Sequence, residues 1–243
     1  TKIERSRFLL YRVNCYFCTK HFCMNFIASS ATLLRHLQSI SGVLSTSNTL
    51  PILDNFLFSI KGNELTVSAT DLETTMITKL SVQTEEDGVV AVPAKLVLEV
   101  LKSLPDQPCT FKVNATFNIE VAYDNGKSKM VGFSGDEFPK LPKIENKSTI
   151  KVSGDIISKA INRTLFAAGN DELRPAMSGV YCQFAKNEII FVATDAHKLV
   201  RYKRTDASAS DSSDFILPKK PLNMLKANLK GDEEITLEYN ESN

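Results

Sequence analysis

The chain has 243 residues, of which 43% are hydrophobic and 23% are charged, and its formal net charge is +1. A chain of this length and composition can bury one large core or two ordinary ones. No apolar run approaches the roughly 20 residues that a membrane-spanning helix needs, so the composition excludes that class of membrane protein.

The first 23 residues differ from the rest, and an amphipathic pattern starts directly after Met24. Cys15–Cys23 has the spacing Cys-x2-Cys-x2-His-x-Cys. Structural zinc sites pair two such knuckles, and the sequence has no second one. We therefore expect no metal and no cofactor, and we expect residues 1–23 to be a disordered or artefactual extension. Cys109 and Cys182 lie in strand-like stretches, which is typical of buried thiols in a cytoplasmic protein.

Four blocks of sequence recur in the same order, which indicates a duplicated domain. Their offsets are nearly constant, at 123, 124, 125 and 125 residues. The matching blocks are 30–40 with 153–163, 56–71 with 180–195, 92–101 with 217–226, and 110–113 with 235–238.

Each copy reads as a helix, alternating strands, a second helix and further strands. Ser30 and Asp155 are predicted to be the N-caps of the first helices, and a Val-Pro or Leu-Pro pair leads into the second helices. We therefore expect an α+β fold, a tandem repeat with helices on one face of antiparallel sheets. Asn243 corresponds to Asn118, so we expect the second copy to stop short of a complete domain.

The tripeptide Ala-Thr-Asp ends a predicted strand in both copies, at 69–71 and 193–195. Because both copies keep it, we interpret it as structural, with the aspartate hydrogen-bonded to the backbone of the next turn. The following residues differ, Leu72–Thr74 against Ala196–Lys198, so we expect any specialised function there. A hydrolase centred on the Asp195–His197 dyad would need a nucleophile. We expect no catalytic residues.

Basic residues concentrate on the predicted helices. Beyond Met24, the helices and their flanks carry nine basic and two acidic residues, whereas the remainder carries 15 basic and 25 acidic residues. This segregation suits a polyanion that is held on one side, through its phosphates rather than its bases. The basic set is Arg35, Lys95, Lys102, Lys159, Arg163, Lys219, Lys220, Lys226 and Lys230.

Six short motifs resemble the bacterial DNA polymerase III beta subunit, the sliding clamp, in the family's order and spacing. They are TLPIL (49–53), TDLE (70–73), VPAK (92–95), DEFPKL (136–141), VATDAHKL (192–199) and LPKK (217–220). By this resemblance residues 24–146 are the first clamp domain, residues 147–243 are the second, truncated at its C-terminus, and the third domain is absent.

The resemblance implies a non-catalytic processivity factor of DNA replication. Two full-length protomers of the family close a homodimeric ring around duplex DNA, with helices lining the hole. A clamp loader opens the ring, which then tethers the replicative DNA polymerase and other proteins that carry a clamp-binding motif. The residues alone leave two other functions open, a non-clamp nucleic-acid-binding scaffold and a hydrolase centred on Asp195 and His197.

Site residues are carried over from the family onto matching positions. The resemblance places Arg174, with the basic helix residues, towards DNA. The chain has Ser47 where the family often has an arginine, and Pro175 and Ala176 where aromatic residues are common. The family usually has glycine at the position of Ala196. The partner-peptide pocket would be formed by Met177, Thr194, Ala196, His197, Lys198 and Leu199.

Overall fold

The computed structural model describes residues 24–44, 50–140, 148–171, 173–206, 212–229, 231 and 233–239. The expectations for residues 1–23, Ser47 and Lys230 lie outside these residues. Within the described ranges, no helix is long and apolar enough to cross a membrane.

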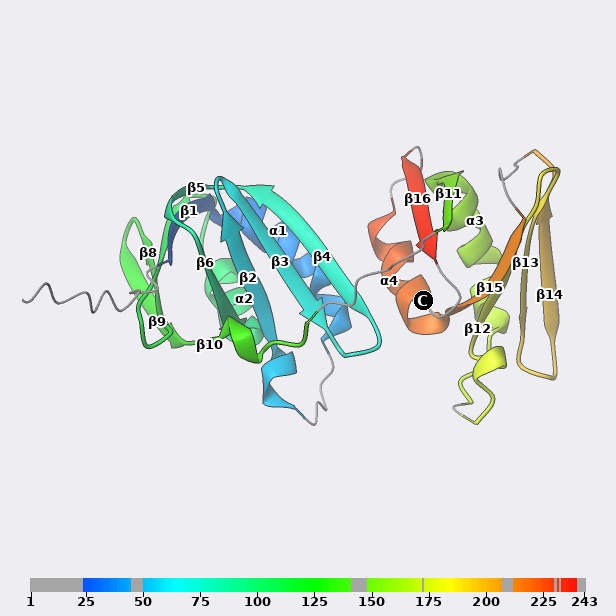
Figure 1. Cartoon of the computed structure of the whole chain (residues 1–243), viewed down its shortest axis with the longest axis horizontal. Helices are drawn as coiled ribbons and strands as arrows, with labels where there is room; N and C mark the ends of the chain where they lie inside the picture. The colour runs from blue at the N-terminus through cyan, green and yellow to red at the C-terminus, as the bar shows by residue number, and fades with distance from the viewer. Residues whose placement is uncertain are drawn as a thin grey trace, which may run out of the picture.

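The first unit contains two five-stranded antiparallel sheets and two helices (Figure 1). The strand orders are β5-β1-β7-β8-β9 and β10-β6-β2-β3-β4. The elements are β1 (Met24–Ser29), α1 (Ser30–Ile40), η1 (Ser41–Val43), η2 (Pro51–Asp54), β2 (Asn55–Lys61), β3 (Glu64–Thr70), β4 (Thr75–Ser81), β5 (Gln83–Glu86), β6 (Gly88–Pro93), α2 (Ala94–Ser103), β7 (Pro108–Val113), β8 (Asn118–Tyr123), β9 (Gly126–Val131), β10 (Phe133–Ser134) and η3 (Gly135–Glu137).

The second unit repeats this plan. β11 pairs with β16 as β1 pairs with β7, and the order β14-β13-β12-β15 corresponds to β4-β3-β2-β6. The duplication and the α+β prediction are therefore confirmed. The elements are β11 (Ser148–Ser153), α3 (Gly154–Thr164), η4 (Leu165–Ala167), η5 (Pro175–Met177), β12 (Gly179–Phe184), β13 (Ile189–Thr194), β14 (Leu199–Arg204), β15 (Ser213–Pro218), α4 (Lys219–Asn228) and β16 (Glu234–Tyr239).

The helices begin one or two residues earlier than the sequence indicated. The N-cap of α1 is Ser29, whose Oγ accepts a hydrogen bond from the N–H of Thr32 at 3.2 Å. Ser30 is buried and instead donates to the carbonyl of Pro105 at 2.7 Å. The residue that caps α3 is Ser153, and Asp155 lies inside its first turn. Both N-cap predictions were wrong, because the extended backbone that a cap requires is set by the preceding strand rather than by the side chain.

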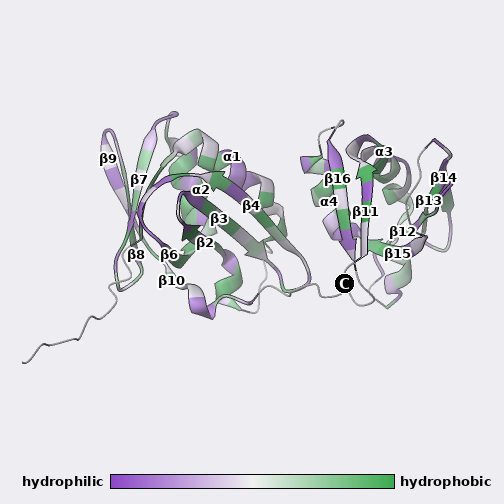
Figure 2. Cartoon of the chain, turned by 45° about the horizontal axis from the view of Figure 1, so that its top comes forward, coloured by the Kyte–Doolittle hydropathy of each residue, from purple (hydrophilic) through white to green (hydrophobic). Residues whose placement is uncertain are grey.

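Each unit has its own apolar core between helices and sheets. Figure 2 shows hydrophobic residues along the helices and strands of both units. In the first core the rings of Phe26 and Phe111 stack with centroids 4.7 Å apart. In the second core Phe184 packs against Phe191 and Phe215, with centroids 6.2 and 5.5 Å away. Full burial of a side chain of this size contributes about 1.5–3 kcal/mol. These rings therefore anchor the strands on which the helices rest.

Candidate functional site

The four helices form one continuous row across both units. Within the first unit α2 packs on α1, within the second α4 packs on α3, and α1 contacts α4 across the boundary. The spatial order is therefore α2-α1-α4-α3. Each helix turns an apolar stripe to its core, such as Leu33 and Leu37 in α1 or Ile157 and Ile161 in α3. The polar stripes consequently face away from both cores.

Four of the basic residues predicted to face DNA have an exposed side chain and no ion pair among the described residues. They are Arg35 on α1, Lys95 and Lys102 on α2, and Lys226 on α4. Lys102 and Lys226 lie in the last turns of their helices, where the helix dipole stabilises a positive charge. They carry uncompensated charge along the row.

Three further basic residues are exposed but interact with an acidic or aromatic side chain of the second unit. Lys159 forms an ion pair with Asp155 at 2.8 Å, and Arg174 pairs with Asp171 at 2.7 Å. The guanidinium of Arg163 lies over the ring of Tyr202, 5.1 Å from its centroid. Their charge is partly offset, so they contribute less to any long-range attraction of phosphate.

Lys219 and Lys220 start α4 and make contacts that the sequence did not indicate. The ammonium of Lys219 donates to the Asn170 side chain at 2.7 Å and to the Ala168 carbonyl at 3.2 Å. Lys220 forms an ion pair with Asp71 of the first unit and donates to the carbonyl of Val43 at 3.3 Å. Lys220 therefore joins the two units rather than standing alone on a helix face.

The repeated Thr-Asp pair organises the β3–β4 turn in the first unit. Thr70 Oγ1 accepts from the N–H of Leu72 and donates to the carbonyl of Thr74, each at 3.1 Å. Asp71 Oδ1 accepts from the N–H groups of Glu73 at 3.1 Å and Thr74 at 2.6 Å. Leu72 takes the left-handed conformation, with φ of 79°.

The β13–β14 turn of the second unit repeats this network. Thr194 Oγ1 accepts from the N–H of Ala196 at 3.2 Å and donates to the carbonyl of Lys198 at 2.8 Å. Asp195 Oδ1 accepts from the N–H groups of His197 at 3.0 Å and Lys198 at 2.9 Å. Ala196 has φ of 75°. The structural interpretation of the Thr-Asp pair is thus confirmed.

The second oxygen of each aspartate is used differently. Asp195 Oδ2 accepts from the ammonium of Lys198 in its own turn at 2.5 Å, whereas Asp71 Oδ2 receives Lys220 from the other unit. The hydrogen bond from Lys198, with those from two backbone N–H groups, holds the pKa of Asp195 well below its usual range. Burial raises the pKa of Asp71, but hydrogen bonds from Lys220 and Thr74 outweigh burial and lower it.

The candidate partner-peptide residues lie around this second turn. η5, which contains Met177, approaches it through Gly169, whose N–H donates to the Met177 carbonyl at 2.8 Å. A Cβ added at Gly169 would lie 3.7 Å from the Cβ of Asp195. Leu199 follows the turn with 65% of its surface exposed. Met177, Leu199 and the turn residues from Thr194 to Lys198 therefore flank one surface.

The same contacts occupy the groups that a hydrolase centred on Asp195 and His197 would use. The Asp195 carboxylate is occupied by Lys198 and two backbone N–H groups, and the Thr194 hydroxyl by the turn. Within the part of the chain that the structure describes, the His197 imidazole makes no hydrogen bond to either group. A nucleophile activated by a histidine–aspartate pair requires such a bond.

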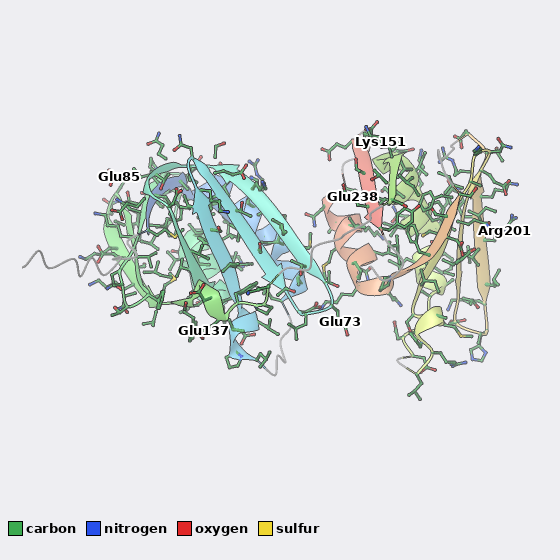
Figure 3. All side chains as sticks on the ribbon, in the orientation of Figure 1. Glu73, Glu85, Glu137, Lys151, Arg201 and Glu238 are labelled. Atoms are coloured by element: carbon green, nitrogen blue, oxygen red, sulfur yellow. The ribbon has the colours of Figure 1, made fainter. Side chains whose placement is uncertain are left out.

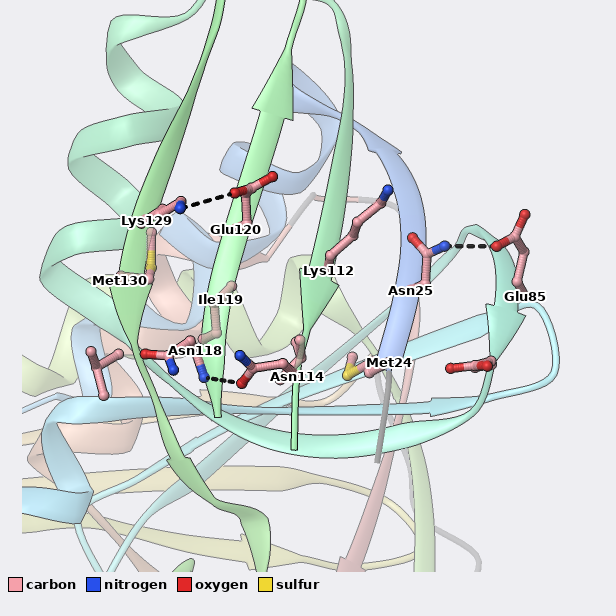
Figure 4. Close-up of a pocket in the computed structure, with 13 residues that line it drawn as sticks. Met24, Asn25, Glu85, Lys112, Asn114, Asn118, Ile119, Glu120, Lys129 and Met130 are labelled. Carbon is pink, nitrogen blue, oxygen red and sulfur yellow. Dashed lines mark hydrogen bonds and ion pairs between the residues drawn. The ribbon is translucent and has the colours of Figure 1, made fainter. Parts of the chain in front are cut away.

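A pocket of about 800 Å³ that sequence reasoning missed lies on the β5-β1-β7-β8-β9 sheet (Figure 4). Strand register aligns charged side chains across its wall, since Lys112 faces Glu120 and Glu120 faces Lys129. Glu120 pairs with Lys129 at 3.5 Å, and the amide of Asn25 donates to Glu85 at 2.7 Å. The alternating charges were visible in the sequence, but only the register shows that they are neighbours.

Family models match both units. The model of the DNA polymerase III beta subunit, N-terminal domain, matches residues 24–142, and the model of its central domain matches residues 151–243.

Curated relatives are similar at low identity. The beta sliding clamp of Staphylococcus epidermidis is 26% identical over 223 residues, which cover 88% of this chain and 59% of the relative. The beta sliding clamp of Synechococcus elongatus is 27% identical over 226 residues, which cover 90% of this chain and 60% of the relative. The chain thus spans about three fifths of the length of these relatives.

Solved structures share the fold. A putative DNA polymerase III beta subunit from Eubacterium rectale superposes with a TM-score of 0.85 at 26% identity, covering 90% of this chain and 60% of that one. A sliding clamp (DNA polymerase III subunit beta) from Pseudomonas aeruginosa, bound to griselimycin, superposes with a TM-score of 0.81 at 25% identity. The match covers 88% of this chain and 58% of that one.

Proposed function

The chain belongs to the family of the DNA polymerase III beta subunit, and on that premise we propose that it carries the first two domains of a sliding clamp. In this function the full-length protein closes a homodimeric ring around duplex DNA in the cytoplasm. The ring tethers the replicative polymerase and is opened by a clamp loader. It contributes no catalytic residue of its own.

One observation carries the proposal, the continuous helix row α2-α1-α4-α3 that crosses both units. Arg35, Lys102 and Lys226 place unpaired charge at exposed positions on three helices of that row. Contacts of this kind attract phosphate without reading base sequence. A clamp needs this property, because it must move along any sequence while remaining attached.

The surface around the second Thr-Asp turn supports a binding role for partner proteins. The second unit exposes large apolar side chains, among them Leu199, which directly follows the turn, and Phe166 and Leu173. Exposed apolar surface of this kind marks protein interaction sites where it is contiguous. Met177, Thr194, Ala196, His197, Lys198 and Leu199 would form this chain's share of the pocket for a hydrophobic clamp-binding peptide.

The DNA contact is tested by charge reversal with a matched control. The test variant changes Arg35, Lys102 and Lys226 to glutamate. The control changes Lys61, Lys112 and Lys186 to glutamate, which are exposed strand or turn residues without an ion pair among the described residues. Both variants alter the net charge equally. Binding of a labelled duplex is measured by fluorescence anisotropy between about 50 and 200 mM salt.

We expect weak binding that ignores sequence and falls steeply with salt. Each lost phosphate contact should lower the slope of log affinity against log salt by about 0.9. The helix variant should therefore lose binding at least about tenfold more than the control. Equal losses in the two variants would show that net charge, and not the helix row, attracts DNA.

A further inference from the structure

A groove runs along the outward side of β1 in the first unit. Two hollows, of about 390 and 500 Å³, form it and share Ile27 and Gln83 in their linings. Along β1 the residues Asn25, Ile27 and Ser29 point outward, because they alternate with residues buried in the core. The groove therefore opens away from the core on which α1 rests.

β5 and β7 form the walls of this groove. Strand register places Gln83 of β5 and Thr110 of β7 on either side of Ile27. β5 pairs with β1 only as far as Ile27, whereas β7 pairs with β1 as far as Ser29, so the groove widens on the β5 side beyond Ile27. Ile27 exposes 38% of its surface in the middle of the groove. An aliphatic side chain of a binding partner can cover this floor, and both apolar surfaces are then removed from water.

A carboxylate lies at each end of the groove. Glu85 lines one end and Asp106 lines the other, and both are exposed. Asn25 Nδ2 donates a hydrogen bond to Glu85 at 2.7 Å. Ser29 Oγ donates one to Asp106, also at 2.7 Å. Because both donors are neutral and neither carboxylate makes an ion pair within the described residues, negative charge is uncompensated at both ends.

The end at Glu85, which Figure 3 shows on the side of the first unit turned away from the second, also holds an unsatisfied acceptor. Asn25 Oδ1 is buried and accepts no hydrogen bond from the described residues. A cation that takes Glu85 from the Asn25 amide frees this amide to turn and present Oδ1 to the same cation. Lys112 stands opposite on the β7 wall (Figure 4). The two exposed carboxylates of β5, Glu85 and Glu86, outweigh this single positive charge.

The distance between the two ends fixes the kind of segment that can reach both. Asn25 and Ser29 are four residues apart on one strand, which corresponds to about 14 Å. An extended partner segment spans the same distance between residues i and i+4, and it places residues i, i+2 and i+4 on one face. A helix places residues i and i+4 only about 5–6 Å apart, which is too close to reach both carboxylates.

We propose that this groove binds an extended segment of a partner protein with the pattern basic-x-aliphatic-x-basic. The aliphatic side chain of the segment covers Ile27, and its two basic side chains pair with Glu85 and Asp106. The segment lies along β1 on the first unit. The candidate partner-peptide pocket lies on the second unit, so this proposal does not depend on the proposed function.

The test is a titration of the full chain with a short synthetic peptide, Thr-Lys-Thr-Leu-Thr-Lys-Thr, blocked at both termini. Its control, Thr-Thr-Lys-Lys-Leu-Thr-Thr, has the same composition and charge but lacks the spacing. Affinity is measured by fluorescence anisotropy of the labelled peptides at about 50 mM salt, where screening is weaker than at physiological ionic strength. An NMR titration of the isotope-labelled chain maps the contact.

The two charges are tested together. Glu85→Gln with Asp106→Asn removes both charges but keeps the hydrogen-bond acceptors. Glu99→Gln with Glu137→Gln is the matched control, since these exposed acids of the first unit also lack an ion pair within the described residues. We expect the groove variant to bind the spaced peptide about five- to tenfold more weakly than the wild type, and the control to stay within about twofold of it.

The apolar contact is tested by Ile27→Thr, with Ile77→Thr, which alters another exposed strand isoleucine, as its control. Only Ile27→Thr should weaken binding, by about threefold or more, because it removes apolar area from the floor of the groove. In the wild type the largest chemical-shift changes should fall on Ile27, Gln83 and Thr110. The absence of binding at millimolar peptide, equal affinity for the two peptides, or shift changes confined to other surfaces would each overturn the proposal.

Discussion

Replacing Ala196 by glycine should stabilise the second unit. Ala196 has φ of 75°, and in this left-handed region a Cβ atom crowds the next carbonyl at a cost of about 1–2 kcal/mol. Glycine removes that strain but loses more backbone entropy on folding, about 0.5–1 kcal/mol relative to alanine. The midpoints of these two ranges leave a net gain of about 0.5–1 kcal/mol. In a unit of this size each kcal/mol raises the unfolding midpoint by about 4–8 °C.

Differential scanning calorimetry measures this effect, since two units can unfold in separate transitions. The transition of the second unit should rise by about 2–8 °C in Ala196→Gly. Leu72→Gly, at φ of 79°, should raise the transition of the first unit. Ala193→Gly is the opposing control, because Ala193 is a buried strand residue outside the left-handed region, and glycine there should lower stability. Unchanged or lowered midpoints at both left-handed positions would refute the reasoning.

Three other predictions follow from particular contacts. Lys220→Met should lower the free energy of unfolding by about 1–3 kcal/mol, as measured by chemical denaturation, because it leaves the Asp71 carboxylate, only 10% exposed, without its cation. Lys226→Met, which removes an exposed lysine of the same helix, should change the free energy of unfolding little. The depressed pKa of Asp195 contributes stability that is present above its unfolded pKa of about 3.9 and is lost as pH falls through the folded value. The difference in unfolding free energy between wild type and Asp195→Asn should therefore shrink below about pH 4, and a difference that stays constant with pH would contradict the lowered pKa of Asp195. Burial raises the pKa of Cys182 to about 12, so peptide mapping should find it unalkylated in the native protein at mildly alkaline pH and modified after unfolding.

Periodic local patterns were readable without any structure. Helices at 30–40 and from 153 onward were predicted because Leu33, Leu37, Ile157 and Ile161 recur at helical spacing, and all four are buried. The Thr-Asp turns were predicted from their presence in both copies, since an aspartate and its turn lie within four residues and interact locally. The exact helix starts were missed, because whether Ser29 or Ser30 caps α1 depends on where β1 ends.

The tertiary structure alone decided how the repeated residues are used. Asp71 and Asp195 occupy the same position in identical turns, yet Lys220 binds the first and Lys198 the second. Lys220 lies 149 residues from Asp71, so no local pattern could relate them. The repeat, its helices and its turns could be predicted without a structure, because they depend on spacing along the chain. Which lysines remain available on the helix row, and which join the two units, was decided by packing, because that depends on which surfaces are brought together.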